Sequence, residues 1–194
     1  MYIKMNNINI FIVGVGGQGT LLAGKILGTY AALTGLDCKL NEVHGMAQRG
    51  GSVVTHVRMG EKIYAPVISE GEADVIVAFE KLEAFRFRHF LKKDGIIIVN
   101  TQEIYPMPVI TGTVKYPENI EETLRESYNV IDVDALSVAL ETGNTKTVNT
   151  VILGILARRL NFDFTIFEQA MRLCVKEKHV EENLVALKRG YTIE

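Results

Sequence analysis

A glycine-rich turn near the start of the chain is the feature that most constrains its fold. The β-branched apolar run Ile8 to Val13 predicts a buried strand, and the apolar period of Leu21 to Leu33 predicts a helix. Between them, Gly14 to Gly19 has the spacing G-x-G-x-x-G, which permits a tight turn and a close approach of backbone to phosphate. A second strand is expected at Cys38 to Leu40, so the chain opens as a βαβ unit.

The remaining patterns predict more strands and then a run of helices. Ser52 to Met59 alternates, and Gly60-Glu61 then predicts a tight turn into Lys62 to Val67, which together make an antiparallel hairpin. Further strands are expected at Ala73 to Phe79, Ile96 to Val99, Asn129 to Val133 and, briefly, Val109-Ile110. Helices are expected at Lys81 to Leu91 (closed by Asp94-Gly95), Asn119 to Ser127, Ala135 to Glu141, Val148 to Leu160, Thr165 to Val175 and Glu177 to Leu187, with caps at Asn144-Thr145 and Asp163.

These patterns define one fold class. We expect an α/β protein with a Rossmann-like open, mostly parallel sheet flanked by helices, an inserted antiparallel hairpin and a helical C-terminal tail. No linker divides the sequence, so residues 1–194 are expected to form a single domain. In open α/β sheets, ligands bind at the carboxyl ends of the strands.

Composition excludes several classes of function. A net charge of −2 with scattered basic residues argues against a nucleic-acid partner or an anionic membrane surface. The apolar segment 148–157 is too short to span a bilayer and the start of the chain lacks a signal-peptide pattern, so a soluble, cytoplasmic protein is expected. Cys38 and Cys174 are expected to be buried thiols, because two distant cysteines cannot by themselves hold an iron–sulfur cluster or a zinc ion.

The densest polar segment is Glu42 to Gly51, with the sequence EVHGMAQRGG. Arg49 with Gly50 and Gly51 could clamp an anion through a guanidinium and exposed backbone N–H groups. His44 could donate to a carbonyl substrate or shuttle a proton, and Glu42 could orient His44 or Arg49. The alternatives are structural: an Arg49–Glu42 pair, a hydrogen-bonded loop histidine and glycines that serve a bend. The other histidines, His56, His89 and His179, are expected on the surface.

The glycine turn also leaves alternatives open. It could lie beside a phosphate or cofactor, or its glycines could only permit tight packing. A dinucleotide-binding enzyme would also need an acid near the end of the second strand, where Glu42 stands. The sequence has no thiamine-binding Gly-Asp-Gly motif, no Walker lysine, no nucleophile elbow and no His–Glu metal pair.

The glycine turn IVGVGGQG and the polar segment EVHGMAQRGGSV resemble the gamma-type domain of 2-oxoacid:ferredoxin oxidoreductases. The HGMAQRGG form is similar to the arylpyruvate branch of that family, the small (beta) subunits of indolepyruvate ferredoxin oxidoreductases. The resemblance implies an enzyme complex that converts a 2-oxoacid and coenzyme A to acyl-CoA and carbon dioxide, with electrons passing to ferredoxin, in aromatic amino-acid breakdown. It also implies a larger alpha subunit that holds thiamine diphosphate and iron–sulfur clusters, and no cofactor held by this chain alone.

Under this hypothesis the chain completes the site of its partner and is inactive alone. The alternatives are a free-standing NAD(P)-binding Rossmann enzyme and a non-catalytic assembly module. The candidate catalytic residues are His44 and Arg49. The candidate cofactor-binding residues are Gly14, Gly16, Gly17, Gln18, Gly19, Glu42, Gln48, Gly50 and Gly51.

Overall fold

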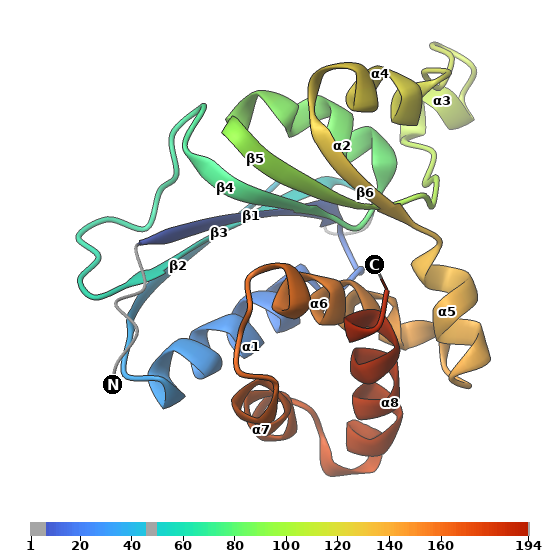
Figure 1. Cartoon of the computed structure of the whole chain (residues 1–194). Coiled ribbons are helices and arrows are strands. Elements are labelled where there is room, and N and C mark those ends of the chain that lie inside the picture. Colours follow the sequence, from blue (N-terminus) through green and yellow to red (C-terminus); the bar gives the residue numbers. More distant parts are fainter. Residues whose placement is uncertain (1–6, 46–49, 194) are drawn as a thin grey trace.

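The computed structural model describes residues 7–45 and 50–193, which form one mixed sheet flanked by helices (Figure 1). The strands are β1 (Ile8–Val15), β2 (Asp37–His44), β3 (Ser52–Gly60), β4 (Ala73–Ala78), β5 (Leu91–Asn100) and β6 (Asn129–Val133). The α-helices are α1 (Thr20–Leu33), α2 (Lys81–Phe87), α3 (Met107–Ile110), α4 (Ile120–Ser127), α5 (Ala135–Glu141), α6 (Val148–Arg159), α7 (Phe164–Cys174) and α8 (Val180–Tyr191).

The sheet has the strand order β2-β3-β1-β4-β5-β6. The pairs β1–β4, β4–β5 and β5–β6 are parallel, whereas β3 is antiparallel to both of its neighbours, β1 and β2. Strands β1 and β2 therefore run in the same direction with β3 between them, and their carboxyl ends lie at the same edge of the sheet. The expected fold class is confirmed, with β2 and β3 as the antiparallel hairpin.

Two hydrophobic cores cover the two faces of the sheet. Helices α1 and α5 to α8 lie on one face, and α2 and α4 lie on the other (Figure 1). The buried residues of α1 and α6, such as Leu27 and Ile152, belong to the first core. In the second core, Phe11 of β1 stacks on Phe90 with ring centroids 4.3 Å apart. The sheet is thus covered on both faces, as in other α/β layer architectures.

Three expected elements are wrong. The second arm of the hairpin, Lys62 to Val67, forms no strand; Arg58 instead donates to the carbonyls of Ala65 and Val67 and holds this segment as a loop. The strand expected at Val109-Ile110 is the short helix α3, which begins after Pro106. The helix expected to reach Leu91 ends at Phe87, and a 3-10 turn, Arg88–Phe90, leads directly into β5.

Burial corrects two further expectations. His56 lies in the core rather than on the surface, because the loop after β3 covers it and the N–H of Ile68 donates to its Nδ1 at 3.1 Å. Cys38 and Cys174 are free thiols that are half-buried rather than fully enclosed. The expected caps are confirmed: Asp163 accepts from the N–H of Ile166, and Asn144 from the N–H of Lys146. Within residues 7–45 and 50–193, no helix is long and apolar enough to cross a membrane.

Candidate functional site

The glycine turn and the end of the polar segment touch through their backbones. The N–H of Gly16 donates to the carbonyl oxygen of Gly51 at 2.9 Å. This bond continues the ladder between β1 and β3, whose last pair is Val15 with Ser52. The two segments singled out in the sequence therefore meet at one rim of the sheet, as its topology requires.

Gln18 holds the glycine turn from inside. Its Oε1 accepts from the N–H of Val15 at 2.7 Å, and its Nε2 donates to the carbonyl of Phe79 at 2.8 Å. The side chain thus bridges the carboxyl ends of β1 and β4, where an open α/β sheet would otherwise leave a crevice. A Cβ on Gly14 would lie 3.0 Å from Gln18 Oε1, so a glycine at this position leaves room for the bridge.

An open cavity of about 360 Å³ lies between the glycine turn and the ends of β2 and β3. Its described lining residues are Gly16, Gly17, Gly19, Thr20, Leu21, Glu42, His44 and Val53. Five of the candidate residues are therefore brought together, from two segments more than twenty positions apart. Gly14 and Gln18 are not among the described lining residues and support the turn from behind.

The first turn of α1 forms one wall of this cavity. Gly19 precedes the helix in a left-handed conformation with φ +86°, and no side chain of the described residues caps the helix. The N-terminal N–H groups of a helix have no acceptors within the helix, and they carry its positive dipole end. Leu21, which is 61% exposed, adds an apolar surface beside them.

Glu42 and His44 line the cavity from the end of β2. The Glu42 carboxylate accepts from the hydroxyls of Thr55 at 3.1 Å and Thr20 at 3.4 Å, so it is tied to β3 and to the start of α1. His44 is exposed, and its Nδ1 lies 3.3 Å from the carbonyl of Gly45. The end of β2 thus combines a fixed carboxylate with an imidazole that a ligand can reach.

Part of the polar segment lies outside the described residues. Met46 to Arg49 are not described, so the structure gives no position for the candidates Gln48 and Arg49. Gly50 is described and has φ +78°, a conformation that glycine adopts at no steric cost. Gly51 is fixed by its bond with Gly16.

Sequence reasoning missed two buried carboxylates behind this rim. Glu80, which is 1% exposed, follows β4 and accepts from the N–H of Glu83, the N–H of Ile104 and the hydroxyl of Tyr116. Glu83 is 4% exposed and accepts from the hydroxyl of Ser52. Burial raises the pKa of Glu83, and the Ser52 hydroxyl and the Arg86 guanidinium partly oppose this shift. In the sequence, acids at helical spacing predict an exposed face of a helix. Only the fold shows that these two carboxylates are buried.

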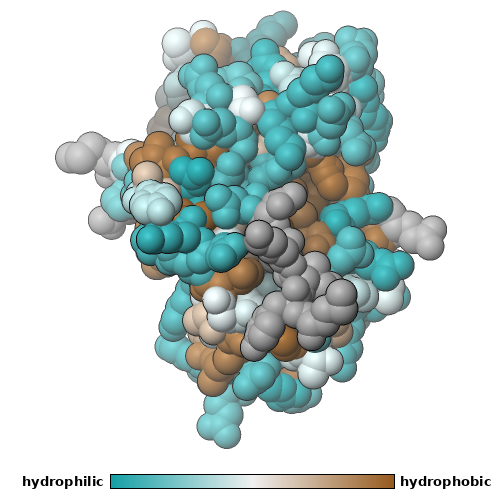
Figure 2. Space-filling model, turned by 60° about the vertical axis from the view of Figure 1, so that its left-hand side comes forward, coloured by the Kyte–Doolittle hydropathy of each residue, from teal (hydrophilic) through white to brown (hydrophobic). Residues whose placement is uncertain are grey.

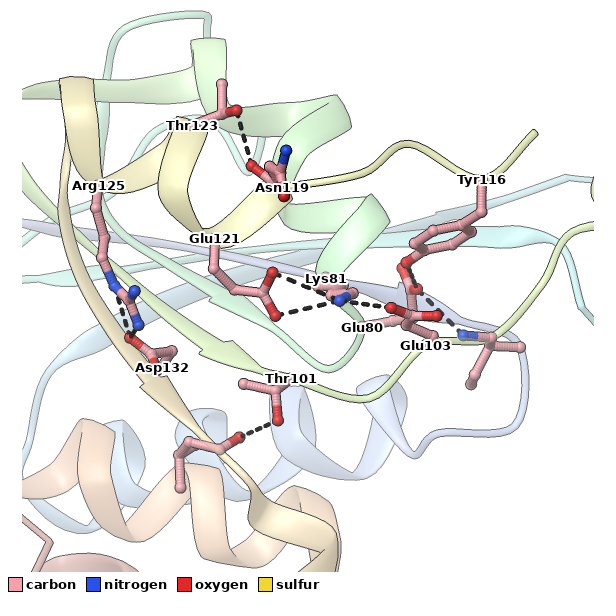
Figure 3. Close-up of polar contacts among 12 residues, drawn as sticks. Glu80, Lys81, Thr101, Glu103, Tyr116, Asn119, Glu121, Thr123, Arg125 and Asp132 are labelled. Atoms are coloured by element: carbon pink, nitrogen blue, oxygen red, sulfur yellow. Dashed lines mark hydrogen bonds and ion pairs between the residues drawn. The ribbon is translucent and has the colours of Figure 1, made fainter. Parts of the chain in front are cut away.

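Figure 3 shows the polar cluster around Glu80 and the start of α2. Lys81 pairs with Glu103 at 2.6 Å and with Glu121 at 3.2 Å, and Tyr116 points at Glu80 (Figure 3). Burial lowers the pKa of Lys81, but the two carboxylates more than offset this and raise it overall. These contacts hold residues 103–121 against the carboxyl ends of β4 and β5.

The surface on the β2 side of the molecule is mixed. When that side is turned forward, the described residues show hydrophobic patches separated by hydrophilic areas (Figure 2). Several exposed apolar side chains, including Val43 of β2 and Tyr64 of the loop between β3 and β4, belong to this part of the chain. In the described part of the chain, no group of three or more His, Cys, Asp or Glu side chains could hold a metal ion.

Residues 9–193 match the family described as pyruvate ferredoxin/flavodoxin oxidoreductase. The chain belongs to this family. Within it, the chain is 44% identical over 189 residues to the "Indolepyruvate oxidoreductase subunit IorB" of Archaeoglobus fulgidus, covering 95% of this chain and 94% of that protein. The resemblance drawn from the glycine turn and the polar segment is thus confirmed.

Two solved oxidoreductase structures share the fold. The pyruvate oxidoreductase subunit PORC of Thermotoga maritima has a TM-score of 0.73 at 24% identity, with 96% of each chain covered. The 2-oxoglutarate:ferredoxin oxidoreductase of Magnetococcus marinus, solved with 2-oxoglutarate, coenzyme A and succinyl-CoA bound, has a TM-score of 0.76 at 19% identity. The match covers 96% of this chain but 31% of that one, so the same fold also occurs as one part of a longer polypeptide.

Proposed function

We propose that the chain is the small subunit of an indolepyruvate ferredoxin oxidoreductase and that residues 1–194 act as one gamma-type domain. The 44% identity to the Archaeoglobus fulgidus subunit, over nearly the whole of both chains, is the observation that carries this proposal. The complex oxidatively decarboxylates indole-3-pyruvate or a related arylpyruvate to an acyl-CoA and transfers the electrons to ferredoxin. We place this activity in the cytoplasm, where reducing conditions keep Cys38 and Cys174 as thiols.

A larger alpha subunit supplies thiamine diphosphate and the iron–sulfur clusters in this proposal. Thiamine diphosphate, when bound there, supplies the carbanion chemistry that decarboxylates the 2-oxoacid. The donor set of this chain does not suit a cluster: Cys174 contacts Thr29 toward the C-terminal end of α1, and Cys38 lies in β2. The contribution of this chain is therefore the rim that carries Gly16, Glu42 and His44.

The cavity at this rim suits one part of coenzyme A. The uncapped start of α1 favours a phosphate group, as helix N-termini do, and Leu21 can contact an apolar or uncharged portion. The Glu42 carboxylate is bonded to Thr20 at the start of α1, so it disfavours more than one anion in the cavity. A single phosphate beside α1 with the rest of the molecule leading toward the partner fits this charge pattern. The imidazole of His44 is then available to donate to, or accept a proton from, a carbonyl group.

The arrangement weighs against a free-standing NAD(P) enzyme. In that fold the acid that binds the ribose ends the strand beside β1. Here β3 lies between β1 and β2, and Glu42 is already bonded to Thr20 and Thr55. Calorimetric titration with NAD and NADP is expected to give no binding heat, whereas micromolar binding would favour the dehydrogenase interpretation.

Reconstitution tests the proposed function. The chain alone and the large subunit alone are expected to show no arylpyruvate-dependent reduction of ferredoxin, and the mixture is expected to restore it. Indole-3-pyruvate should be preferred over pyruvate and 2-oxoglutarate in kcat/KM. Full turnover by the isolated chain, or preference for pyruvate, would reject the proposal.

A variant of the polar segment separates a site from a docking surface. We expect Arg49→Ala to lower the activity of the assembled complex more than it lowers the melting temperature, because a guanidinium that binds an anion contributes little to folding. Co-purification with the large subunit should persist. Loss of assembly with unchanged specific activity of the remaining complex would instead support a non-catalytic assembly module.

A further inference from the structure

The first residue of β3 is hydrogen-bonded to α2, the helix on the sheet face opposite α1. Ser52 follows the two glycines of the polar segment, and its hydroxyl donates to the Glu83 carboxylate in the first turn of α2. Glu83 is nine-tenths or more buried and also pairs with Arg86 at 3.2 Å. A side chain from a helix thus holds the point where the polar segment enters the sheet.

The same helix turn is itself anchored. The backbone N–H of Glu83 donates to Glu80 Oε2 at 2.9 Å, and Glu80 also accepts from Ile104 and Tyr116. Glu83 therefore has a fixed backbone as well as a buried side chain. One continuous path of contacts runs from this anchor through Ser52 and Gly51 to Gly16 at the cavity.

We propose that Glu83 is a positioning residue for the cavity, acting through Ser52 on the Gly51 carbonyl and so on the Gly16 turn. The consequence for turnover rests on the proposed function, but the positioning itself can be measured on the isolated chain. We assign Glu83 a positioning role rather than a catalytic one, because it is not among the described lining residues of the cavity.

The position of the Gly16–Gly51 bond explains why such an anchor matters. The ladder between β1 and β3 ends at Val15 and Ser52, so the Gly16–Gly51 bond lies one step beyond the last pair. Terminal hydrogen bonds open most easily, and glycine has the greatest backbone freedom of any residue. Gly50 and Gly51 have no side chains, so among the described residues the nearest side-chain anchor is that of Ser52.

Amide hydrogen exchange of the isolated chain tests the positioning directly. We expect Ser52→Ala to accelerate exchange of the Gly16 amide by about tenfold, the factor that corresponds to one lost hydrogen bond. The amide of Ile12, in the middle of β1, should change by less than about twofold because local opening does not reach it. Ser52→Thr keeps the hydroxyl and should restore slow exchange.

A matched control removes a similar bond elsewhere. Ser137 donates its hydroxyl to Asp134 at 2.6 Å at the start of α5, so Ser137→Ala loses a serine–carboxylate bond that follows β6, three strands away from β1 in the sheet. It should leave exchange at Gly16 unchanged. An unchanged Gly16 rate in Ser52→Ala, or equal acceleration at Gly16 and Ile12, would overturn the proposal.

The acceptor gives the second test. Glu83→Gln keeps an oxygen that can accept from Ser52 and should hold exchange at Gly16 near the wild-type rate, whereas Glu83→Ala should match Ser52→Ala.

In the reconstituted complex, Ser52→Ala should raise KM for coenzyme A several-fold with a smaller change in kcat, and Ser52→Thr should reverse it. Fast Gly16 exchange with an unchanged KM would leave the positioning intact and count against the proposed coenzyme A site alone.

Discussion

The N–H of Gly16 and the carbonyl oxygen of Gly51 are joined by a hydrogen bond of 2.9 Å. These residues belong to two turns that the sequence separates by more than thirty positions, and their contact brings both turns to one rim. The rim exists because β3 lies between two strands that run in the same direction. Around the cavity at this rim lie an uncapped helix start, a fixed carboxylate and an exposed imidazole, the last two from the end of β2.

Gly19 is expected to tolerate no side chain. Its φ is +86°, and a Cβ there would lie 2.4 Å from Asn149 Nδ2 of α6. Gly19→Ala should therefore lower the free energy of unfolding by about 2 kcal/mol or more, as backbone strain and overpacking add. Urea denaturation of the isolated chain measures this loss.

Gly28 provides the matched control in the same helix. It lies within α1, and a Cβ there would meet nothing within 4 Å. Gly28→Ala should raise the free energy of unfolding by about 0.5 to 1 kcal/mol, because alanine favours the helix. Equal losses in the two variants would contradict the structural account of Gly19.

Glu80 is expected to be the costliest carboxylate to remove. Glu80→Ala would leave the N–H groups of Glu83 and Ile104 and the hydroxyl of Tyr116 without their acceptor. We expect a loss of about 3 kcal/mol, since each buried unpaired donor is penalised. Asp134→Ala, which removes an exposed helix cap at α5, should lose only about 1 kcal/mol. Comparable losses by chemical denaturation would show that Glu80 is not a structural centre.

The sequence predicted the strands and helices near the site because their patterns are local. The run Ile8 to Val13, the glycine turn and the α1 period each identify their own conformation, and the topology then brings the turns together. The resemblance of the polar segment to a known family predicted the relationship that the comparison confirms.

The errors arose where a residue's environment depends on distant partners. Alternation over residues 52–59 predicted an antiparallel strand but could not identify β2 as its hairpin partner, and the Lys62–Val67 arm was wrong. Period-2 alternation also cannot show that a loop covers the second face, so buried His56 was assigned to the surface. Glu80 and Glu83 were missed because their donors come from residues 52, 104 and 116, which only the fold brings together.

His56 should make the fold less stable in mild acid. Burial lowers its pKa from 6.5, and its Nδ1 must stay unprotonated to accept from Ile68. As pH falls, the unfolded chain therefore binds the proton before the native state does. The contribution of His56 to the free energy of unfolding is complete above pH 6.5 and is lost as pH decreases through the lowered pKa. NMR titration should place the His56 midpoint below 6.5, and urea unfolding should show a corresponding loss that is smaller in His56→Gln. A midpoint at or above 6.5 would refute the buried assignment.

Glu83 should show the opposite dependence on pH. Burial raises its pKa above 4.5, against the opposing effects of Ser52 and Arg86 and with added repulsion from Glu80. The native state then keeps the proton longer than the unfolded chain, so this group's contribution to stability falls as pH rises above 4.5. Glu83→Gln removes the ionisation and should gain stability relative to wild type between pH 4.5 and 7 in urea unfolding. A relative loss over that range would mean that the charge stabilises the fold.

The most direct test of the cavity's function is the KM for coenzyme A of the reconstituted complex with Leu21→Glu and with its control, Leu173→Glu. The two leucines are 61% and 62% exposed, but Leu21 lines the cavity, whereas Leu173 lies on α7. Neither variant should lower the melting temperature, and an acid in the first turn of α1 favours the helix. The account predicts that Leu21→Glu raises KM about tenfold or more by repelling phosphate at the start of α1, while Leu173→Glu changes it less than about twofold. Equal KM values in the two variants would contradict the claim that this cavity binds coenzyme A and completes the partner's site.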